Sequence, residues 1–136
     1  MRFDWSEYLN LAEELAAISG DSDNNEAKLR SAISRAYYAV FCLARNYLRD
    51  VEQDSRLSRK TPDINEHQYV AKEFIFHKSK AKKMIKIGEN LSRLRLFRNK
   101  ADYEDRVFTL SSDVKIALKM AQNIMTSLSE LNRETE

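Results

Sequence analysis

Only two glycines and one proline occur among the 136 residues of the chain. Tight turns and β-hairpins depend on these residue types, so their scarcity predicts an all-helical fold. At this length roughly two-thirds of the unfolded chain's surface can be buried, which is enough for one hydrophobic core. We therefore expect a single all-α domain over residues 1–136.

The composition also bears on metal sites and on cellular location. The single cysteine, Cys42, has no partner for a disulfide within the chain. One cysteine and two histidines cannot form the usual ligand set of a tetrahedral zinc site, so we expect neither a metal nor a cofactor. No apolar run approaches the roughly 20 residues of a membrane-spanning helix, and residues 1–15 lack the features of a signal peptide. These features predict a cytoplasmic protein.

Apolar residues recur every three or four positions in the first half of the chain, which is the spacing of one helix face. The first such segment runs from Trp5 to Ile18, and Gly20 marks its end. The second runs from about Glu26 to Val51, and its long apolar face is typical of the central helix of a bundle. The polar residues 52–65, which include Pro62, predict a loop.

The same spacing returns in the second half. A short helix is expected over about residues 64–77, and a fourth helix from Met84 to Phe97. Residues 96–105 leave the helical period. Ser111 or Ser112 can cap a fifth helix that ends near residue 131, after which the tail should fray.

Charge is distributed unevenly along the chain. Residues 1–26 carry seven acids against one arginine, a net charge of −6, whereas residues 56–86 carry nine bases against three acids, a net charge of +6. A basic cluster of that kind can attract phosphate backbones, although the plainer interpretation is a solvated helix face.

A polar stripe follows the second predicted helix beside its apolar face. Its members are Ser31, Arg35, Tyr38, Cys42, Arg45 and Arg49. A buried arginine needs a partner, so this stripe faces either solvent or a surface lined with acceptors. Arg35, Tyr38 and Arg45 are the candidate binding residues here.

A second candidate cluster lies where the fourth predicted helix ends, at Arg98, Asn99, Asp102 and Tyr103. Arg98 and Asp102 are four residues apart, so the plain interpretation is an exposed ion pair worth a few tenths of a kcal/mol. Alternatively, Arg98 binds a phosphate with Asn99 as a second donor, and Tyr103 stacks on a base or ribose.

Three segments together resemble the HEPN domain family of prokaryotes. They are Ser-Ala-Ile-Ser-Arg-Ala-Tyr-Tyr-Ala-Val-Phe at 31–41, His67 ahead of Val70 and Phe74, and Arg-Asn-Lys-Ala-Asp-Tyr at 98–103. The resemblance covers residues 5–130 and implies an antiparallel four-helix up-and-down bundle with an additional short helix. It also implies a two-fold homodimer, often encoded beside a nucleotidyltransferase in toxin–antitoxin or defence systems.

Many members of that family are metal-independent ribonucleases in which four to six residues separate the arginine from a histidine. Here those positions hold Tyr103, Glu104 and Asp105. Histidine exchanges a proton near neutral pH and these side chains do not, so the resemblance does not establish catalysis. His67 is expected to be a buried structural histidine and His77 an exposed helix cap.

The leading hypothesis is a dimeric component of a two-protein system with a nucleotidyltransferase partner, which contacts RNA or nucleotide. The first alternative is an endoribonuclease toxin using Arg98, Asp102 and Tyr103, with His67 or another base. The second is a helical adaptor that touches no nucleic acid. The resemblance also makes Tyr103 a candidate acceptor for modification by the transferase, whereas the plain interpretation is a buried tyrosine that locks the helix connection.

Overall fold

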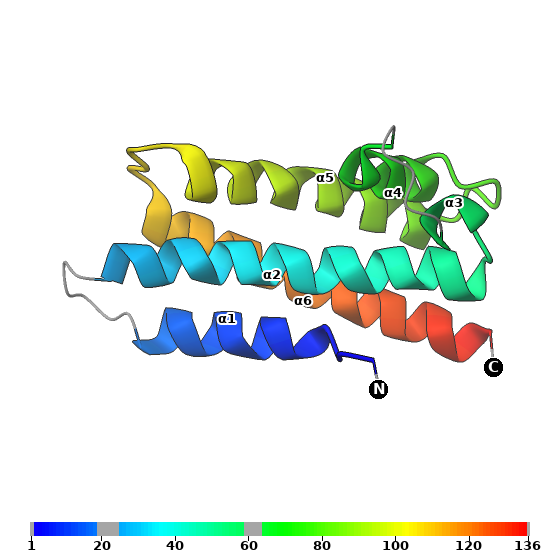
Figure 1. Ribbon diagram of the computed structural model, residues 1–136, viewed down its shortest axis with the longest axis horizontal. Helices are drawn as coiled ribbons and strands as arrows, with labels where there is room; N and C mark the ends of the chain where they lie inside the picture. Colours follow the sequence, from blue (N-terminus) through cyan, green and yellow to red (C-terminus); the bar gives the residue numbers. More distant parts are fainter. Residues whose placement is uncertain (1, 19–24, 59–63, 136) are drawn as a thin grey trace.

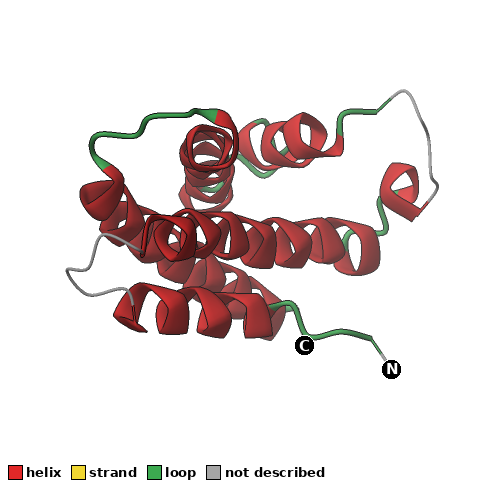
Figure 2. Ribbon diagram, turned by 60° about the vertical axis from the view of Figure 1, so that its left-hand side comes forward, coloured by secondary structure: helices red, strands yellow, loops and turns green. Residues whose placement is uncertain are grey.

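Helices account for nearly all of the regular structure. The computed structural model describes residues 2–18, 25–58 and 64–135. In chain order its elements are α1 (Ser6–Ile18), α2 (Glu26–Asn46), the π-helical turn η2 (Tyr47–Val51), α3 (Ser55–Ser58), α4 (Glu66–Ile75), α5 (Lys82–Tyr103) and α6 (Leu110–Glu134). None of these residues forms a β-strand (Figure 2), which confirms the all-α prediction.

The helix α2 lies at the centre of the bundle. The four long helices α1, α2, α5 and α6 alternate in direction along the chain, and α2 packs against the other three (Figure 1). The short helix α4 lies against α5. This is the predicted up-and-down bundle with an additional short helix.

Small side chains allow α2 to approach its neighbours closely. Ala32, Ala36, Ala39 and Ala44 are completely buried, and larger side chains such as Ile33 and Tyr37 fill the space between them. The helix and η2 run without interruption from Glu26 to Val51, as the apolar pattern predicted.

The prediction that residues 96–105 leave the helical period is wrong for residues 96–103, and only Glu104 and Asp105 lie beyond the helix. Helix α5 continues to Tyr103. Phe97 is only partly buried and is not the last residue on the buried side of the helix, which continues to Ala101. The residues buried on this side are Met84, Ile87, Gly88, Leu91, Leu94, Arg98 and Ala101. Arg98 therefore occupies a position that the spacing assigns to an apolar side chain.

Other boundaries also differ from the prediction. The expected loop contains the short helix α3, and α6 begins after Thr109 rather than at a serine cap. The tail that was expected to fray is helical up to Glu134. Gly20 and Pro62 lie outside the described residues.

His77 is not the exposed cap that the sequence predicted. Its Nε2 lies 2.7 Å from a carboxylate oxygen of Glu52, and its Nδ1 lies 2.7 Å from the hydroxyl of Ser79. The contact with Glu52 ties the connection after α4 to the residues that follow η2.

Helices α4 and α5 lie in close backbone contact at Gly88. A Cβ atom there would lie 2.6 Å from the backbone oxygen of Ala71 and 2.7 Å from the backbone nitrogen of Ile75. Only glycine fits this contact, so Gly88 sets how closely the two helices pack.

No helix in the described ranges is long and apolar enough to cross a membrane.

Candidate functional site

Arg98 is the centre of the candidate site. Its side chain is buried, with the residue only 5% exposed, between α5 and α2. Its Cζ atom lies 5.2 Å from the ring centroid of Tyr37, 5.3 Å from that of Tyr38 and 6.0 Å from that of Tyr103. A guanidinium group surrounded by aromatic rings is held by cation–π attraction.

These rings do not satisfy the hydrogen-bonding capacity of Arg98. Its nearest carboxylate oxygen, on Asp102, lies 3.7 Å from Nη1, and its buried Nε has no hydrogen-bond partner among the described residues. A buried cation without hydrogen bonds costs free energy. The ion pair with Asp102 that the sequence predicted is present, but its Arg98 side chain is buried rather than exposed. The unpartnered Nε leaves the site with unused capacity to bind an anion.

The end of α5 is fixed against α2 by a residue that the sequence analysis did not single out. Arg30 donates hydrogen bonds to the carbonyl oxygens of Ala101 at 2.9 Å and Glu104 at 2.6 Å. Ser34 lies 3.3 Å from a carboxylate oxygen of Asp102. These contacts hold the last turn of α5, and with it Tyr103, in place.

His67 of α4 meets the same cluster from the other side. Its Nδ1 lies 2.6 Å from the hydroxyl of Tyr37, and its ring stacks on Phe41 with centroids 4.4 Å apart. Burial, and then the charges of Arg95 and Arg98, lower the pKa of His67 to about 4. Burial also raises the pKa of Tyr37, so the neutral phenol donates to the neutral imidazole.

A groove of about 470 Å³ opens between α4 and α5 beside this pair. His67, Arg95 and Asn99 line it together with apolar side chains of both helices. The Nε of Arg95 is buried without a hydrogen-bond partner in the described part of the chain, as is that of Arg98. The groove and the Arg98 cluster therefore form one cationic region.

Tyr103 lies at the surface rather than within the bundle. It is 74% exposed, although its ring faces the guanidinium of Arg98. The prediction that Tyr103 is a buried tyrosine that locks the connection between the helices is therefore wrong. An exposed phenol next to an arginine is accessible both to a stacking base and to a modifying enzyme.

The HEPN domain family profile matches residues 6–131. The chain belongs to the HEPN domain family. It is also 28% identical over 138 residues to Uncharacterized protein MJ0992 of Methanocaldococcus jannaschii, an alignment that covers 93% of this chain and 77% of that protein. No solved structure is significantly similar to the chain.

The cluster of this HEPN domain includes some predicted site residues and excludes others. It brings Arg98, Asp102 and Tyr103 together with Tyr38 and His67, and Asn99 borders the adjoining groove. Arg35 and Arg45 lie elsewhere on α2, where their guanidinium groups face the rings of Tyr8 and Trp5.

Sequence reasoning missed Arg95, whereas the apolar spacing does predict the buried position of Tyr37. Arg95 had a signal in the spacing, because it lies three residues before Arg98 and shares its side of the helix. Tyr37 follows Ile33 by four residues and continues the apolar row of α2.

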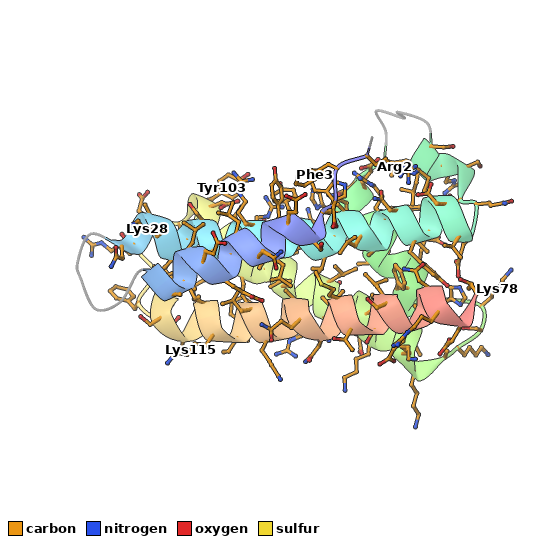
Figure 3. All side chains as sticks on the ribbon, turned by 90° about the horizontal axis from the view of Figure 1, so that it is seen from below. Arg2, Phe3, Lys28, Lys78, Tyr103 and Lys115 are labelled. Carbon is orange, nitrogen blue, oxygen red and sulfur yellow. The ribbon has the colours of Figure 1, made fainter. Side chains whose placement is uncertain are left out.

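The basic stretch 56–86 is divided between two places: Lys72 lines the groove beside the Arg98 cluster, whereas the lysines from Lys78 onward lie away from it. Lys78 and the start of α5 lie at the end of the bundle opposite Tyr103 (Figure 3). There Lys83 is held by Glu130 at 2.8 Å and Glu134 at 3.1 Å.

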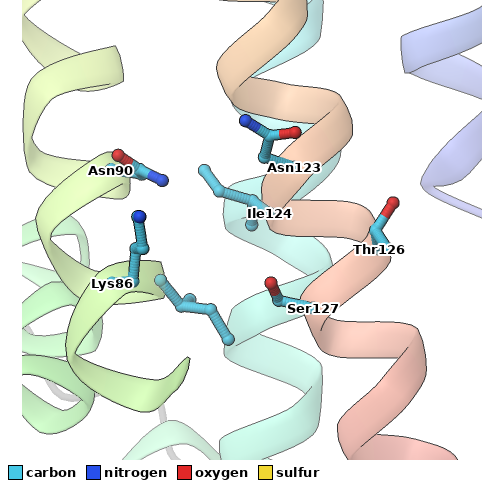
Figure 4. Close-up of a pocket in the computed structure, with 7 residues that line it drawn as sticks. Lys86, Asn90, Asn123, Ile124, Thr126 and Ser127 are labelled. Atoms are coloured by element: carbon cyan, nitrogen blue, oxygen red, sulfur yellow. The ribbon is translucent and has the colours of Figure 1, made fainter. Parts of the chain in front are cut away.

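A second hollow, of about 280 Å³, lies between α5 and α6 (Figure 4). Lys86, Asn90 and Asn123 line it, and it contains none of the predicted site residues. Within the described ranges no group of three or more histidine, cysteine or acidic side chains could hold a metal ion.

Proposed function

We propose that this HEPN domain is the RNA- or nucleotide-binding component of a prokaryotic two-protein system, that it works as a homodimer, and that its partner is a nucleotidyltransferase. The observation that carries the proposal is the buried Arg98 guanidinium, which has tyrosine rings around it and whose Nε has no hydrogen-bond partner among the described residues. A phosphate oxygen would supply the missing acceptor, and the exposed Tyr103 ring would stack on a base or ribose.

Binding is better supported than cleavage. Cleavage by a ribose 2′-hydroxyl needs a group that exchanges a proton near neutral pH. His67 is the histidine nearest to Arg98, and its pKa of about 4 makes it a weak base that cannot act as an acid at neutral pH. The endoribonuclease alternative therefore lacks a suitable residue at this site.

The surface beside the site supports the homodimer. Phe76 and Leu96 are both large, exposed and apolar, and both line the groove between α4 and α5. A two-fold interface over these residues would bring the two Arg98 clusters near each other and concentrate positive charge.

RNA titration of the purified protein tests the binding proposal. We expect salt-sensitive binding of single-stranded RNA, which Arg98→Met weakens by about 10- to 100-fold because a charge-assisted contact is lost. Arg93→Gln, which changes an exposed arginine elsewhere on α5, should leave the affinity unchanged. Absence of RNA binding at low salt, or equal affinities for the two variants, would contradict the proposal.

The partner is tested separately, by co-expression with the adjacent open reading frame. If that frame encodes a nucleotidyltransferase, we expect the two proteins to co-purify. The Tyr103 hydroxyl should then take the nucleotidyl group of a nucleoside triphosphate with release of pyrophosphate, and gain the mass of a nucleoside monophosphate less one water. Tyr103→Phe is the control and should stay unmodified with its stability unchanged, because the phenol makes no hydrogen bond within the described chain. An unmodified Tyr103 beside an active transferase removes the acceptor hypothesis.

A further inference from the structure

We propose that the hollow between α5 and α6 binds a small molecule that carries one carboxylate group on an apolar body. The hollow contains no residue of the Arg98 cluster, and Lys86 precedes Arg98 by twelve residues, about 18 Å along a helix. The inference therefore goes beyond the proposed function and does not depend on it. The residues that form the site are Lys86, Ile87 and Asn90 of α5 and Asn123, Ile124 and Ser127 of α6.

The two helices contribute matching sets of side chains. Lys86 and Asn90 lie four residues apart on α5, and Asn123 and Ser127 lie four residues apart on α6, so each pair shares one face of its helix. Figure 4 shows these polar side chains around the hollow. An isoleucine follows the first member of each pair, and both isoleucines are only 1% exposed. The hollow therefore has an apolar floor and a polar rim.

Lys86 differs from other lysines of α5 that face α6. Nζ of Lys83 lies 2.8 Å from a carboxylate oxygen of Glu130, and Nζ of Lys100 lies 3.4 Å from one of Asp113. Lys86 lies between these two ion pairs and has no carboxylate partner among the described residues. The contact between the helices thus leaves one ammonium group without a counter-charge, and that group is at the hollow.

The neutral polar groups of the rim are also available to a ligand. The side chains of Asn90, Asn123 and Ser127 make no hydrogen bond within the part of the chain that the structure describes. The residues that line the hollow include no acid. Amide and hydroxyl groups donate hydrogen bonds to a carboxylate, and such bonds are stronger than those to a neutral acceptor. One ammonium group with neutral donors matches a single negative charge.

The size and the floor of the hollow determine the rest of the ligand. The hollow measures about 280 Å³. A cavity of about 150 Å³ holds one benzene molecule, so there is room for a ring or a branched alkyl group together with a carboxylate. The two isoleucines favour such an apolar body. Inorganic phosphate has no apolar part to contact this floor, and its charge exceeds that of one lysine.

A titration with benzoate, followed by the backbone amide chemical shifts in NMR spectra, tests the proposal. We expect the amides of residues 86–90 and 123–127 to shift together, with a dissociation constant of about 1 mM. Benzamide has the same ring without the charge, and inorganic phosphate has charge without the ring. Both should bind at least about tenfold more weakly than benzoate.

Two substitutions change the charge of the hollow. Lys86→Met removes the ammonium group and should weaken benzoate binding about tenfold. Asn123→Asp places a carboxylate across from Lys86, where it should pair with the lysine and exclude benzoate to a similar extent.

Matched substitutions elsewhere are the controls. Lys28→Met and Ser112→Asp make the same changes in net charge at exposed positions outside the hollow, and both should leave the affinity unchanged. Thermal unfolding of all four variants checks that each one folds.

The outcomes separate this inference from its alternatives. Equal affinity for benzamide, or an equal effect of Lys28→Met, would overturn recognition of a carboxylate by Lys86. Shifts confined to residues outside the hollow would overturn the site. If benzoate leaves these amides unmoved while Lys86→Met stops co-purification with a partner protein, the hollow receives a side chain of that partner and the proposal is wrong. Absence of RNA binding would contradict the proposed function and leave this inference standing.

Discussion

His67 and Arg98 are the two residues on which the chemistry of this site depends. His67 accepts a hydrogen bond from Tyr37 at 2.6 Å, and the charges of Arg95 and Arg98 add to the burial that keeps it neutral. Protonation would add a third positive charge to a region that already holds two. The two arginines therefore disfavour the charged form of His67 and favour the binding of an anionic ligand.

This arrangement predicts a pH-dependent stability. The pKa of His67 is about 4 in the folded protein and 6.5 in an unperturbed chain, so the unfolded state takes up the proton first. The contribution of His67 is fully present above pH 6.5 and is lost as the pH falls towards 4. In urea unfolding from about pH 7 to about pH 4, the wild type should lose more stability than His67→Gln. Parallel curves for the two proteins would contradict the neutral, buried histidine.

At the level of elements, the contact of α4 with α5 determines the shape of the groove. The backbones of the two helices meet at Gly88, and the groove opens beside this contact, lined by His67 from α4 and by Arg95 and Asn99 from α5. The structure thus makes Gly88 a determinant of the site although it touches none of the predicted site residues.

Gly88→Ala tests this role. The added methyl group would lie 2.6 Å from the backbone oxygen of Ala71, and a backbone atom cannot move aside as a flexible side chain can. We expect a loss of about 1–3 kcal/mol in the free energy of unfolding, in spite of the better helix propensity of alanine. Ser92→Ala, at an exposed position on the same helix, is the control and should be near neutral. A more stable Gly88→Ala protein would show that α4 is free to shift.

Much of the helical pattern was predictable from the spacing of apolar residues, whereas the end of α5 was not. The predicted bounds of α1, α2 and α4 agree with the structure within a few residues. The end of α5 was predicted too early because the buried position after Leu94 holds an arginine, which breaks an apolar pattern without breaking the helix. For the same reason Arg98 and Tyr103 were both identified as site residues, but Arg98 was expected to be exposed and Tyr103 buried, which is the reverse of the structure. The spacing in sequence could not show that α4 brings His67 to Tyr37, because that contact depends on tertiary packing.

At the level of the whole molecule, the proposed homodimer would place the groove at an interface. Leu96→Arg introduces a charge into the exposed apolar side of the groove and should convert the dimer to a monomer. Ile116→Arg changes an exposed apolar residue of α6 that does not line the groove, and it serves as the control. Sedimentation at tens of micromolar distinguishes the two states. A wild-type monomer under these conditions would contradict the homodimer.

Arg98→Met tests the central claim, which is that Arg98 is buried for a ligand and contributes little to the stability of the fold. Methionine fills a similar volume among the three tyrosine rings and removes a buried charge whose Nε has no hydrogen-bond partner in the part of the chain that the structure describes. The measurement is the free energy of unfolding of this variant and of the wild type in urea without RNA. The account predicts a value equal to the wild type or higher by about 1 kcal/mol. A loss of about 3–5 kcal/mol, the cost of breaking a buried ion pair, would show that Arg98 serves the fold and would contradict the account.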